Sequence, residues 1–163
     1  MDYDCVTITV GDIDMADERF SHRFRIEPCD CHAGCALPPV VVKKKGYRII
    51  SGFRRVKALS EKGNATVLQV LVPRGDRDDK ELFLLSLELN SEATLSDLDR
   101  AVLVRKAVDT FALSQDELVR HLAPLCGVEP SWKMIRRFLE LSTLAPVLLE
   151  YLFKNRLGLK FAS

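Results

Sequence analysis

The chain has 163 residues, and 47% of them are hydrophobic, which is enough for one ordinary domain or two small ones. It carries 24 lysine and arginine residues against 23 aspartate and glutamate residues, a formal net charge of +1. This balance excludes a global basic field, so any binding of nucleic acid must come from local clusters. The start of the chain lacks the pattern of a secretory signal, and no apolar stretch approaches a membrane span. We therefore expect a soluble, cytoplasmic protein without a membrane partner.

The N-terminal half is predicted to combine strands with one helix. The segment Gly11–Phe24 is polar and charged, and we interpret it as a surface connection with space for a short helical turn. A helix is predicted over Phe53–Lys62, because apolar residues recur on one face and Gly63 follows as a stop signal. Alternating or β-branched residues predict strands at Val6–Val10, Val40–Val42, Tyr47–Ile50 and Thr66–Val72.

The junction between the strand Tyr47–Ile50 and the basic helix is the main candidate for a phosphate site. Gly52 allows the backbone to approach a ligand closely, and the amides in the first turn of a helix are unpaired donors. Arg54 and Arg55 add fixed positive charge in a geometry that suits phosphate oxygens. The pattern alone is not specific, because any exposed basic helix start looks similar.

A second cluster combines three cysteines with one histidine: Cys29, Cys31, His32 and Cys35. Thiolate and imidazole are ligands that zinc prefers. Structural zinc usually takes two ligand pairs from separated segments, however, and one short loop wraps a tetrahedron poorly. We therefore favour unligated thiols over a zinc site and keep the metal, and an adventitious disulfide, as alternatives.

From residue 80 onward the hydrophobic period is helical, so the chain is interpreted as α+β, with a small mixed-sheet domain at 1–79 and an all-helical domain at 80–163. Two capping signals mark helix starts in this half: Thr94 or Ser96 for one helix, and the Ser114-x-x-Glu117 capping box for another. The expected helices cover Lys80–Leu89, the stretch from the first cap to about Phe111, the capping box to about Leu125, Trp132–Leu141, and about Leu144–Phe153.

Residues 114–141 have the layout of a helix–turn–helix, in which a turn containing Gly127 separates a capped helix from a basic one. Such a helix can enter a major groove, where arginine reads guanine and lysine steadies phosphate. The alternative is a plain helical bundle with a solvated basic face, and the turn at 123–127 looks longer than in common units of this kind. The candidate DNA-binding residues are Ser131, Lys133, Arg136 and Arg137.

In the order of its segments, most of the chain resembles the N-terminal and central domains of the ParB family of chromosome- and plasmid-partition proteins. The Gly52-Phe53-Arg54-Arg55-x-x-Ala58 motif is the most specific part of this resemblance. The other parts are Pro39-Val40-Val41-Val42, Tyr47–Ser51, the helix after Leu95, and Leu113–Leu118 leading into the helix–turn–helix. In that family the N-terminal domain binds CTP, with the glycine and the arginine pair at the phosphates, and the helix–turn–helix binds a DNA site. The resemblance thus implies a DNA-binding protein of partition or transcription regulation that binds CTP, or another nucleotide, at Gly52, Arg54 and Arg55.

The chain departs from the family pattern at two places that concern catalysis. Phe53 stands where the family usually has glutamate. The family's Glu-Asn-x-x-Arg box, which helps to hold magnesium and phosphate, falls on Leu87–Thr94. Glu88 and Asn90 are present there but not adjacent, and no arginine follows them. A cation needs oxygen ligands in fixed geometry, so the incomplete box argues against CTP hydrolysis with magnesium.

The family usually continues into a C-terminal dimerisation domain, which is absent from this chain, so the resemblance leaves a homodimer as one possible assembly. Sulfiredoxin shares the N-terminal fold but uses a cysteine directly after the motif glycine, where this chain has Phe53. The alternative function is a nucleotide-hydrolysing, phosphotransfer or nuclease-type enzyme that uses the same arginines. A third interpretation is an interaction module whose helical half binds protein.

Overall fold

The structure is a computed structural model that describes residues 2–27, 40–42, 46–90 and 94–157. The chain divides into two compact units, and each is described by itself. The first comprises Met1–Ser21 and Arg25–Ser86, and the second comprises His22–Phe24 and Leu87–Ser163. The first unit combines a mixed sheet with helices and the second is helical, so the predicted α+β class is confirmed. Among the described residues, no helix is long and apolar enough to cross a membrane.

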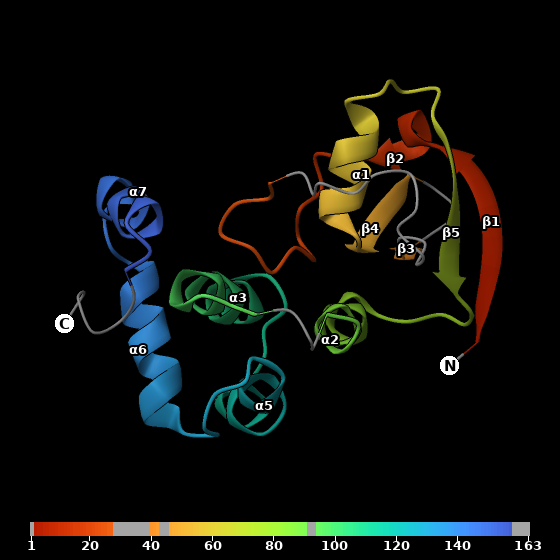
Figure 1. Cartoon of the computed structure of the whole chain (residues 1–163). Coiled ribbons are helices and arrows are strands. Elements are labelled where there is room, and N and C mark those ends of the chain that lie inside the picture. The colour runs from red at the N-terminus through yellow and green to blue at the C-terminus, as the bar shows by residue number, and fades with distance from the viewer. Residues whose placement is uncertain (1, 28–39, 43–45, 91–93, 158–163) are drawn as a thin grey trace. The chain divides into compact units, whose positions relative to one another are not determined.

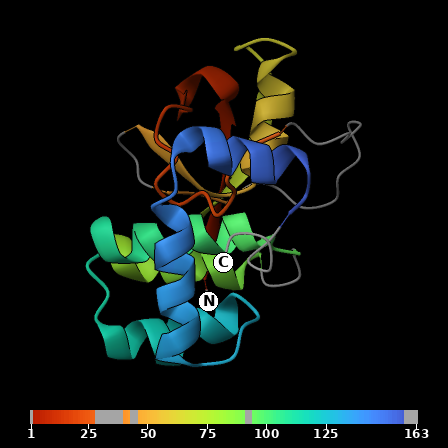
Figure 2. The same cartoon turned by 90° about the vertical axis from the view of Figure 1, so that its left-hand side faces the viewer.

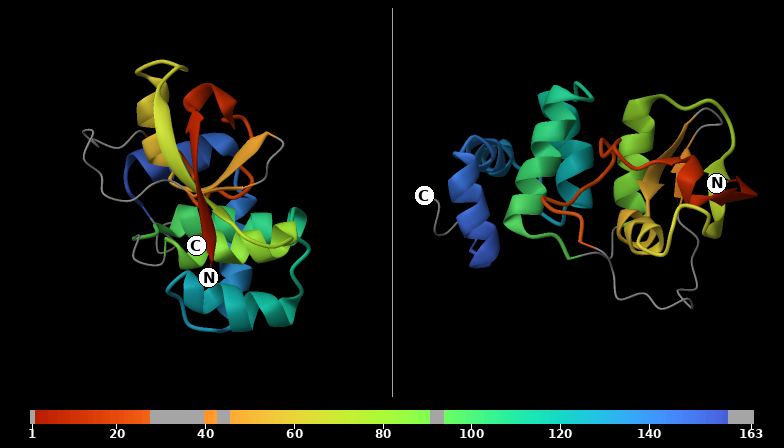
Figure 3. Two further views of the ribbon diagram at one scale, coloured as in Figure 1. Left: turned by 90° about the vertical axis from the view of Figure 1, so that its right-hand side faces the viewer. Right: turned by 90° about the horizontal axis from the view of Figure 1, so that it is seen from above.

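The first unit is built on a five-stranded sheet with the order β1-β5-β3-β4-β2. β1 runs antiparallel to β5 over its whole length, and the two lie side by side in Figures 1 and 3. β3 is antiparallel to β4 and parallel to β5, and β2 is parallel to β4, so the sheet is mixed. The strands are β1 (Tyr3–Thr9), β2 (Ile13–Asp14), β3 (Val40–Val42), β4 (Tyr47–Ser51) and β5 (Val67–Pro73).

The core of this unit follows the alternation of the strands. In β5, Leu68 and Val70 are buried, whereas Val67, on the opposite face, is 64% exposed, as expected for a strand with one solvated face. In β4, the adjacent residues Ile49 and Ile50 are both fully buried, so this strand is covered on both faces. β4 therefore lies at the centre of the hydrophobic core, directly before the candidate phosphate site.

The helix α1 (Phe53–Ser60) follows β4 after one residue, Gly52. Gly52 has φ 94° and ψ 15°, a left-handed conformation that glycine adopts without a steric penalty. The reversal turns the chain from an extended strand into a helix, which then buries Phe53 and Val56 against the core. The predicted helix Phe53–Lys62 is thus present and ends slightly earlier.

The prediction of a surface connection over Gly11–Phe24 is wrong in part. The short helical turn exists, as the 3-10 segment Val10–Asp12, but Ile13 and Asp14 then form β2, and Phe20 is fully buried. Charged residues dominate the composition of this stretch and hide the few apolar residues that reach the core. A two-residue parallel strand also leaves no local periodicity from which it could be predicted.

An ion network fastens this connection to the rest of the first unit. Arg19 contacts Asp17 and Asp79 at 2.9 Å each, and Arg48 of β4 contacts the same two carboxylates at 3.2 and 3.8 Å. Asp79 is the first residue of α2 (Asp79–Glu88), where a negative charge also suits the helix dipole. The network therefore joins β4, the connection after β2 and the start of α2.

The second unit is an assembly of helices in which α3 packs against α6. A segment that opens on the Ser114–Glu117 capping box continues as helix to Leu125, with a π-helical stretch in its middle. Figure 2 shows α7 running across the end of α6. The elements are α3 (Asp97–Asp109), α4 (Gln115–Glu117), η2 (Leu118–Leu122), α5 (Ala123–Leu125), α6 (Trp132–Ser142) and α7 (Pro146–Lys154).

The turn predicted at 123–127 begins later than expected. Ala123–Leu125 is helical, so the connection to α6 covers Cys126–Ser131. Arg100 of α3 donates from Nε to the carbonyl of Cys126 at 3.1 Å, which satisfies a carbonyl at the end of α5. This contact ties the connection that precedes α6 to α3.

The second unit also contains His22–Phe24, which Asp99 binds to the start of α3. Asp99 is only 5% exposed. Its carboxylate accepts hydrogen bonds from the Ser96 amide (2.9 Å), the Ser96 hydroxyl (2.8 Å), Arg23 Nη1 (3.1 Å) and the Phe24 amide (2.8 Å). The Phe24 ring packs against Phe153, with ring centroids 5.4 Å apart. We call the contacts of Asp99 with Arg23 and Phe24 the Asp99 clasp.

His22 directly precedes the clasp residues in the chain, and its buried surroundings favour the neutral form of its imidazole. It is 8% exposed, and its buried Nδ1 has no hydrogen-bond partner among the described residues. Burial lowers the pKa of His22 to about 4, helped by the positive charges of Arg23 and Lys106 and opposed by Asp99. The folded second unit therefore resists protonation of this imidazole.

We expect the free energy of unfolding to fall on acidification because of His22. The unfolded histidine binds a proton near pH 6.5 and the folded one only near pH 4. The unfolded state therefore binds more protons in this window, and stability is lost as the pH falls through it. Between pH 7.5 and pH 5, protonation of His22 in the unfolded state should lower the free energy of unfolding by about 2 kcal/mol.

Urea unfolding at several pH values measures this loss. The variant His22→Leu should show a flatter pH dependence, whereas His121→Leu, at an exposed histidine, should keep the original slope. An identical slope for His22→Leu and the unchanged protein would contradict the assignment.

Substitution of Gly52 should destabilise the first unit through backbone strain. Gly52→Ala places a Cβ in a left-handed conformation and should cost about 1–2 kcal/mol, whereas Gly52→Asn should cost less because asparagine tolerates this region. Thermal unfolding of the two variants gives the comparison. Equal stability of the alanine variant and the unchanged chain would show that the helix does not start in this way.

Candidate functional site

The start of α1 has the geometry of an anion-binding helix terminus. The carbonyl of Gly52 accepts hydrogen bonds from the amides of Arg55 (2.9 Å) and Val56 (3.0 Å), so regular helix begins immediately after the glycine. The amides of Phe53 and Arg54, at the first two helical positions, have no acceptor earlier in the helix. The first turn of α1 contains no acidic residue to compete for them. The terminus can therefore stabilise negative charge.

The two arginines of the motif differ in their surroundings. Arg54 is exposed, and among the described residues its one hydrogen bond runs from Nε to the carbonyl of Glu27 at 3.0 Å. The terminal Nη atoms of its guanidinium are left to contact a ligand. Arg55 is half-buried. The pair thus offers one exposed and one half-buried cation.

Phe53, the first residue of α1, is buried in the core and is 8% exposed. It serves as an apolar anchor for the helix start. An apolar residue at this position adds packing beneath the terminus and brings no carboxylate to it. Both effects favour holding an anion, since a buried ring fixes the helix and no first-turn carboxylate repels phosphate.

Glu88 and Asn90, the other two predicted nucleotide-site residues, lie around the end of α2. Glu88 is the exposed last residue of α2, and the Asn90 amide donates to the carbonyl of Leu87 at 3.0 Å. Both belong to the second unit, whereas Gly52, Arg54 and Arg55 belong to the first. Their joint role in one pocket remains a prediction.

The predicted Cys/His cluster lies outside the described residues, because Cys29, Cys31, His32 and Cys35 fall within 28–39. In the part of the chain that the structure describes, no group of three or more His, Cys, Asp or Glu residues could hold a metal ion. Cys126 is buried, and burial raises the pKa of its thiol to about 12. That cysteine is therefore protonated and unreactive at neutral pH.

The helix α6 separates an apolar face from a basic one. Ile135, Phe138 and Leu141 are nearly fully buried, which fixes the helix on its neighbours. Ser131 precedes the helix as its N-cap, in an extended conformation without a capping bond from its side chain. Three of the predicted DNA-binding residues lie together on the exposed face: Lys133, Arg136 and Arg137.

The charges on this face are only partly neutralised. Arg136 pairs with Glu140 one turn later, with Nε and the carboxylate 3.3 Å apart and both side chains exposed. Within the described residues, Lys133 and Arg137 have no ion-pair partner. Their charges are therefore the ones most available to an external anion.

Trp132 was not among the residues predicted from the sequence, yet it belongs to the same surface. It is the first residue of α6 and is 37% exposed, beside Lys133. An exposed tryptophan at the start of a basic helix offers a flat surface for stacking. In the sequence, its position next to the N-cap indicates an exposed residue at the helix start. Trp132 also fits the apolar periodicity of the helix, however, and can therefore be taken for a core residue.

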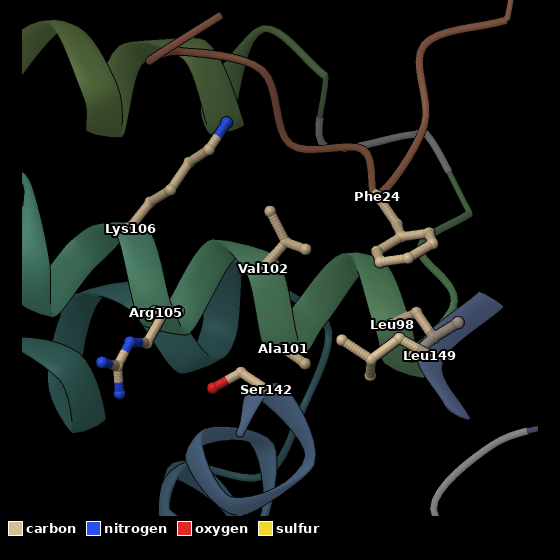
Figure 4. A pocket seen from close by; sticks show the side chains of 8 residues that line it. All are labelled: Phe24, Leu98, Ala101, Val102, Arg105, Lys106, Ser142 and Leu149. Atoms are coloured by element: carbon tan, nitrogen blue, oxygen red, sulfur yellow. The ribbon is translucent and has the colours of Figure 1, made fainter. Parts of the chain in front are cut away.

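A hollow of about 160 Å³ opens in the second unit between α3, the end of α6 and α7 (Figure 4). Its lining is largely apolar, and Arg105 is turned aside into a pair with Asp109. A site for a nucleotide needs roughly 300 Å³ or more and several converging polar groups. We therefore assign no ligand to this hollow. It is lined by Phe24, Leu98, Ala101, Val102, Arg105, Lys106, Ser142 and Leu149.

Comparison with known proteins finds no matching family model and no match among curated proteins. Among solved structures, the chain is similar to the C-terminally truncated chromosome-partitioning protein ParB from Caulobacter crescentus complexed to the centromeric parS site. The identity is 17%, over 94% of this chain and 80% of that chain, with a TM-score of 0.47. It is also similar to the C-terminally truncated ParB from the same organism complexed with CTP-gamma-S, with 17% identity over 94% of this chain and 86% of that chain, and a TM-score of 0.36.

Proposed function

We propose that this chain is a ParB-like DNA-binding protein of chromosome or plasmid partition, or of transcription regulation, that binds a nucleoside triphosphate. The start of α1 is the nucleotide-contacting element in this proposal and α6 is the DNA-contacting one. The observation that carries the nucleotide half is the left-handed Gly52, which sets two arginines on the first turn of a helix without an acidic neighbour. That arrangement combines backbone donors with charge-assisted ones.

CTP is the nucleotide we propose first, because the sequence motif resembles one that contacts CTP phosphates. Gly52 would allow close approach of the backbone, and Arg54 and Arg55 would contact phosphate oxygens. Magnesium fits as a companion ion, since it is commonly held by one or two protein oxygens together with phosphates. From the sequence, Glu88 and Asn90 are the candidate oxygen donors for such an ion, which would neutralise phosphate charge.

We propose binding without hydrolysis. The glutamate of the family motif is replaced by the buried Phe53, and the Glu-Asn-x-x-Arg box lacks its arginine. Each change removes a polar group from the set that would orient a phosphate for attack. Turnover by this chain would instead favour the alternative of a nucleotide-hydrolysing enzyme.

Removal of either motif arginine should weaken nucleotide binding. Each of Arg54→Gln and Arg55→Gln deletes charge-assisted hydrogen bonds and should raise the Kd for CTP by about tenfold or more. Isothermal titration with CTP, ATP, GTP and UTP, with and without magnesium, measures the affinities and the base preference.

A matched control for these variants is Arg74→Gln, which removes an exposed arginine that pairs with Asp4 in the same unit. This variant should bind nucleotide as tightly as the unchanged chain. Absence of triphosphate binding, or equal loss in all three variants, would refute a phosphate site at the start of α1. Unfolding temperatures check that each variant is folded.

The DNA half of the proposal rests on the exposed basic face of α6. The apolar face holds the helix on the second unit, and Lys133, Arg136 and Arg137 project from the other side. A helix of this kind fits the major groove, where its early residues reach base edges and lysine contacts phosphate. We propose that Trp132 contacts DNA together with Ser131 and these three residues.

Substitutions on α6 should separate phosphate contacts from base contacts. Lys133→Gln should weaken binding about equally for all duplexes and reduce the slope of log Kobs against log salt by about 1. Arg137→Gln should cost about 1–3 kcal/mol on the preferred sequence and less on others. Fluorescence anisotropy over a salt series, on duplexes selected from a random pool, measures both.

The control for these variants is Arg120→Gln, at an exposed arginine that pairs with Asp116 on the preceding helix. It should leave the affinity and the salt slope nearly unchanged. A loss as large as that of Lys133→Gln would show that DNA is not read by α6. A chain without salt-sensitive DNA affinity would contradict this half of the proposal.

A further inference from the structure

Two side chains of α1 bind neighbouring backbone carbonyls within the first unit. Lys57 Nζ donates to the carbonyl of Ile26 at 2.6 Å, and Arg54 Nε donates to the carbonyl of Glu27 at 3.0 Å. Arg54 and Lys57 are three positions apart in a helix, so they lie on the same face of α1. All four residues belong to the first unit. We call these two hydrogen bonds the α1 clamp.

Lys57 is a basic residue of α1 whose ammonium group is bound to the protein itself. A lysine one turn after Arg54 could supply a third positive charge to a bound phosphate. In the structure it is half-buried instead, and its Nζ makes a short, charge-assisted hydrogen bond to the carbonyl of Ile26. Lys57 therefore fixes the position of Ile26 relative to α1.

The position of Ile26 determines where the acceptor for Arg54 lies. Glu27 follows Ile26 directly, and one residue of chain spans at most about 3.6 Å. The carbonyl of Glu27 therefore cannot move far from α1 while Lys57 holds Ile26. Loss of the bond at Ile26 would leave the Glu27 carbonyl attached to α1 through Arg54 alone within the clamp.

The bond from Nε to Glu27 orients the guanidinium of Arg54, an exposed residue of the proposed phosphate site. A guanidinium is planar and its N–H donors form a rigid fork, so a partner at Nε fixes the plane and leaves the Nη donors for an oxyanion. A side chain that is oriented in advance loses less conformational freedom when it binds a ligand. The α1 clamp thus prepares Arg54 to bind phosphate.

We propose that Lys57 is a positioning residue for phosphate at the start of α1. It holds Ile26, and thereby the carbonyl that orients Arg54, and it does not contact phosphate itself. The phosphate half of this proposal rests on the proposed function, whereas the orientation of Arg54 by Lys57 does not. A substitution of Lys57 should therefore weaken phosphate binding only through Arg54.

The first arm of the test needs no ligand. Lys57→Met removes the bond to the Ile26 carbonyl and keeps the aliphatic stem, and Lys57→Gln takes its place if the methionine variant does not fold. The Nε proton of Arg54, followed by NMR, is protected from exchange with water while the Glu27 carbonyl accepts it. We expect this exchange to accelerate about fivefold in Lys57→Met. Lys62→Met, at an exposed lysine just after α1, is the matched control and should leave it unchanged.

The second arm is a double-mutant cycle in ligand binding. CTP and inorganic tripolyphosphate are titrated into Lys57→Met, Arg54→Gln and the variant that carries both substitutions. We expect Lys57→Met to raise the Kd of both ligands about threefold, and to cause no further loss when Arg54 is already replaced. A lysine that contacted phosphate itself would cause the same loss in both backgrounds.

The outcomes decide the two halves of the proposal separately. Unchanged exchange at Arg54 Nε in Lys57→Met overturns the positioning role, whatever the binding result. Equal losses of affinity in both backgrounds overturn it as well, because Lys57 would then be a phosphate contact, and so does an unchanged Kd in Lys57→Met. Faster exchange in a chain that binds neither CTP nor tripolyphosphate keeps the orientation of Arg54 by Lys57 and refutes the proposed nucleotide site.

Discussion

The buried carboxylate of Asp99 is the contact on which the helical unit depends. A carboxylate that is 5% exposed loses its hydration and must recover it from protein donors. Asp99 does so with the amide and hydroxyl of Ser96 and with the Arg23 guanidinium and the Phe24 amide. One group thus caps α3 and also fixes a segment more than seventy positions earlier in the chain. Removal of Asp99 would leave several donors unsatisfied at once, and such losses are larger than that of a single surface contact.

The start of α1 presents positive charge at a position that buried residues hold rigidly on both sides. The buried residues Ile49 and Ile50 anchor the strand before it, and Phe53 anchors the helix after it. Gly52 makes the reversal between them without strain. The arginines that follow lie at the N-terminus of α1, which is the positive end of the helix dipole. A bound anion is therefore stabilised both by the dipole and by the arginine charges. This convergence supports phosphate binding more strongly than the two arginines alone.

The sequence predicted those elements whose signals are local. Of the two candidate caps Thr94 and Ser96, Ser96 begins α3, and the capping box at Ser114 and the helix after Gly52 lie where their residue patterns indicate. The strand predicted at Thr66–Val72 is present as Val67–Pro73. Their determinants sit within a few residues of one another, which is the range that patterns can register.

The missed features depend on partners that are distant in the chain. β2 exists because Ile13 and Asp14 pair with β4, more than thirty positions later. The burial of Phe53 and the clasp at Asp99 likewise follow from packing and not from local pattern. For the candidate site, the sequence placed the arginines of α1 and the basic face of α6, but it did not indicate that Arg54 and Lys57 also bind backbone carbonyls at 26–27.

The most direct test of the central claim is a map of backbone amide chemical shifts during a titration with CTP. A phosphate held at the start of α1 should move the amide signals of Gly52–Arg55 first and furthest, with smaller changes at 25–27, and should leave those of α6 in place. Shifts confined to α6, or none at saturating CTP, would contradict the account that this helix terminus is the nucleotide site.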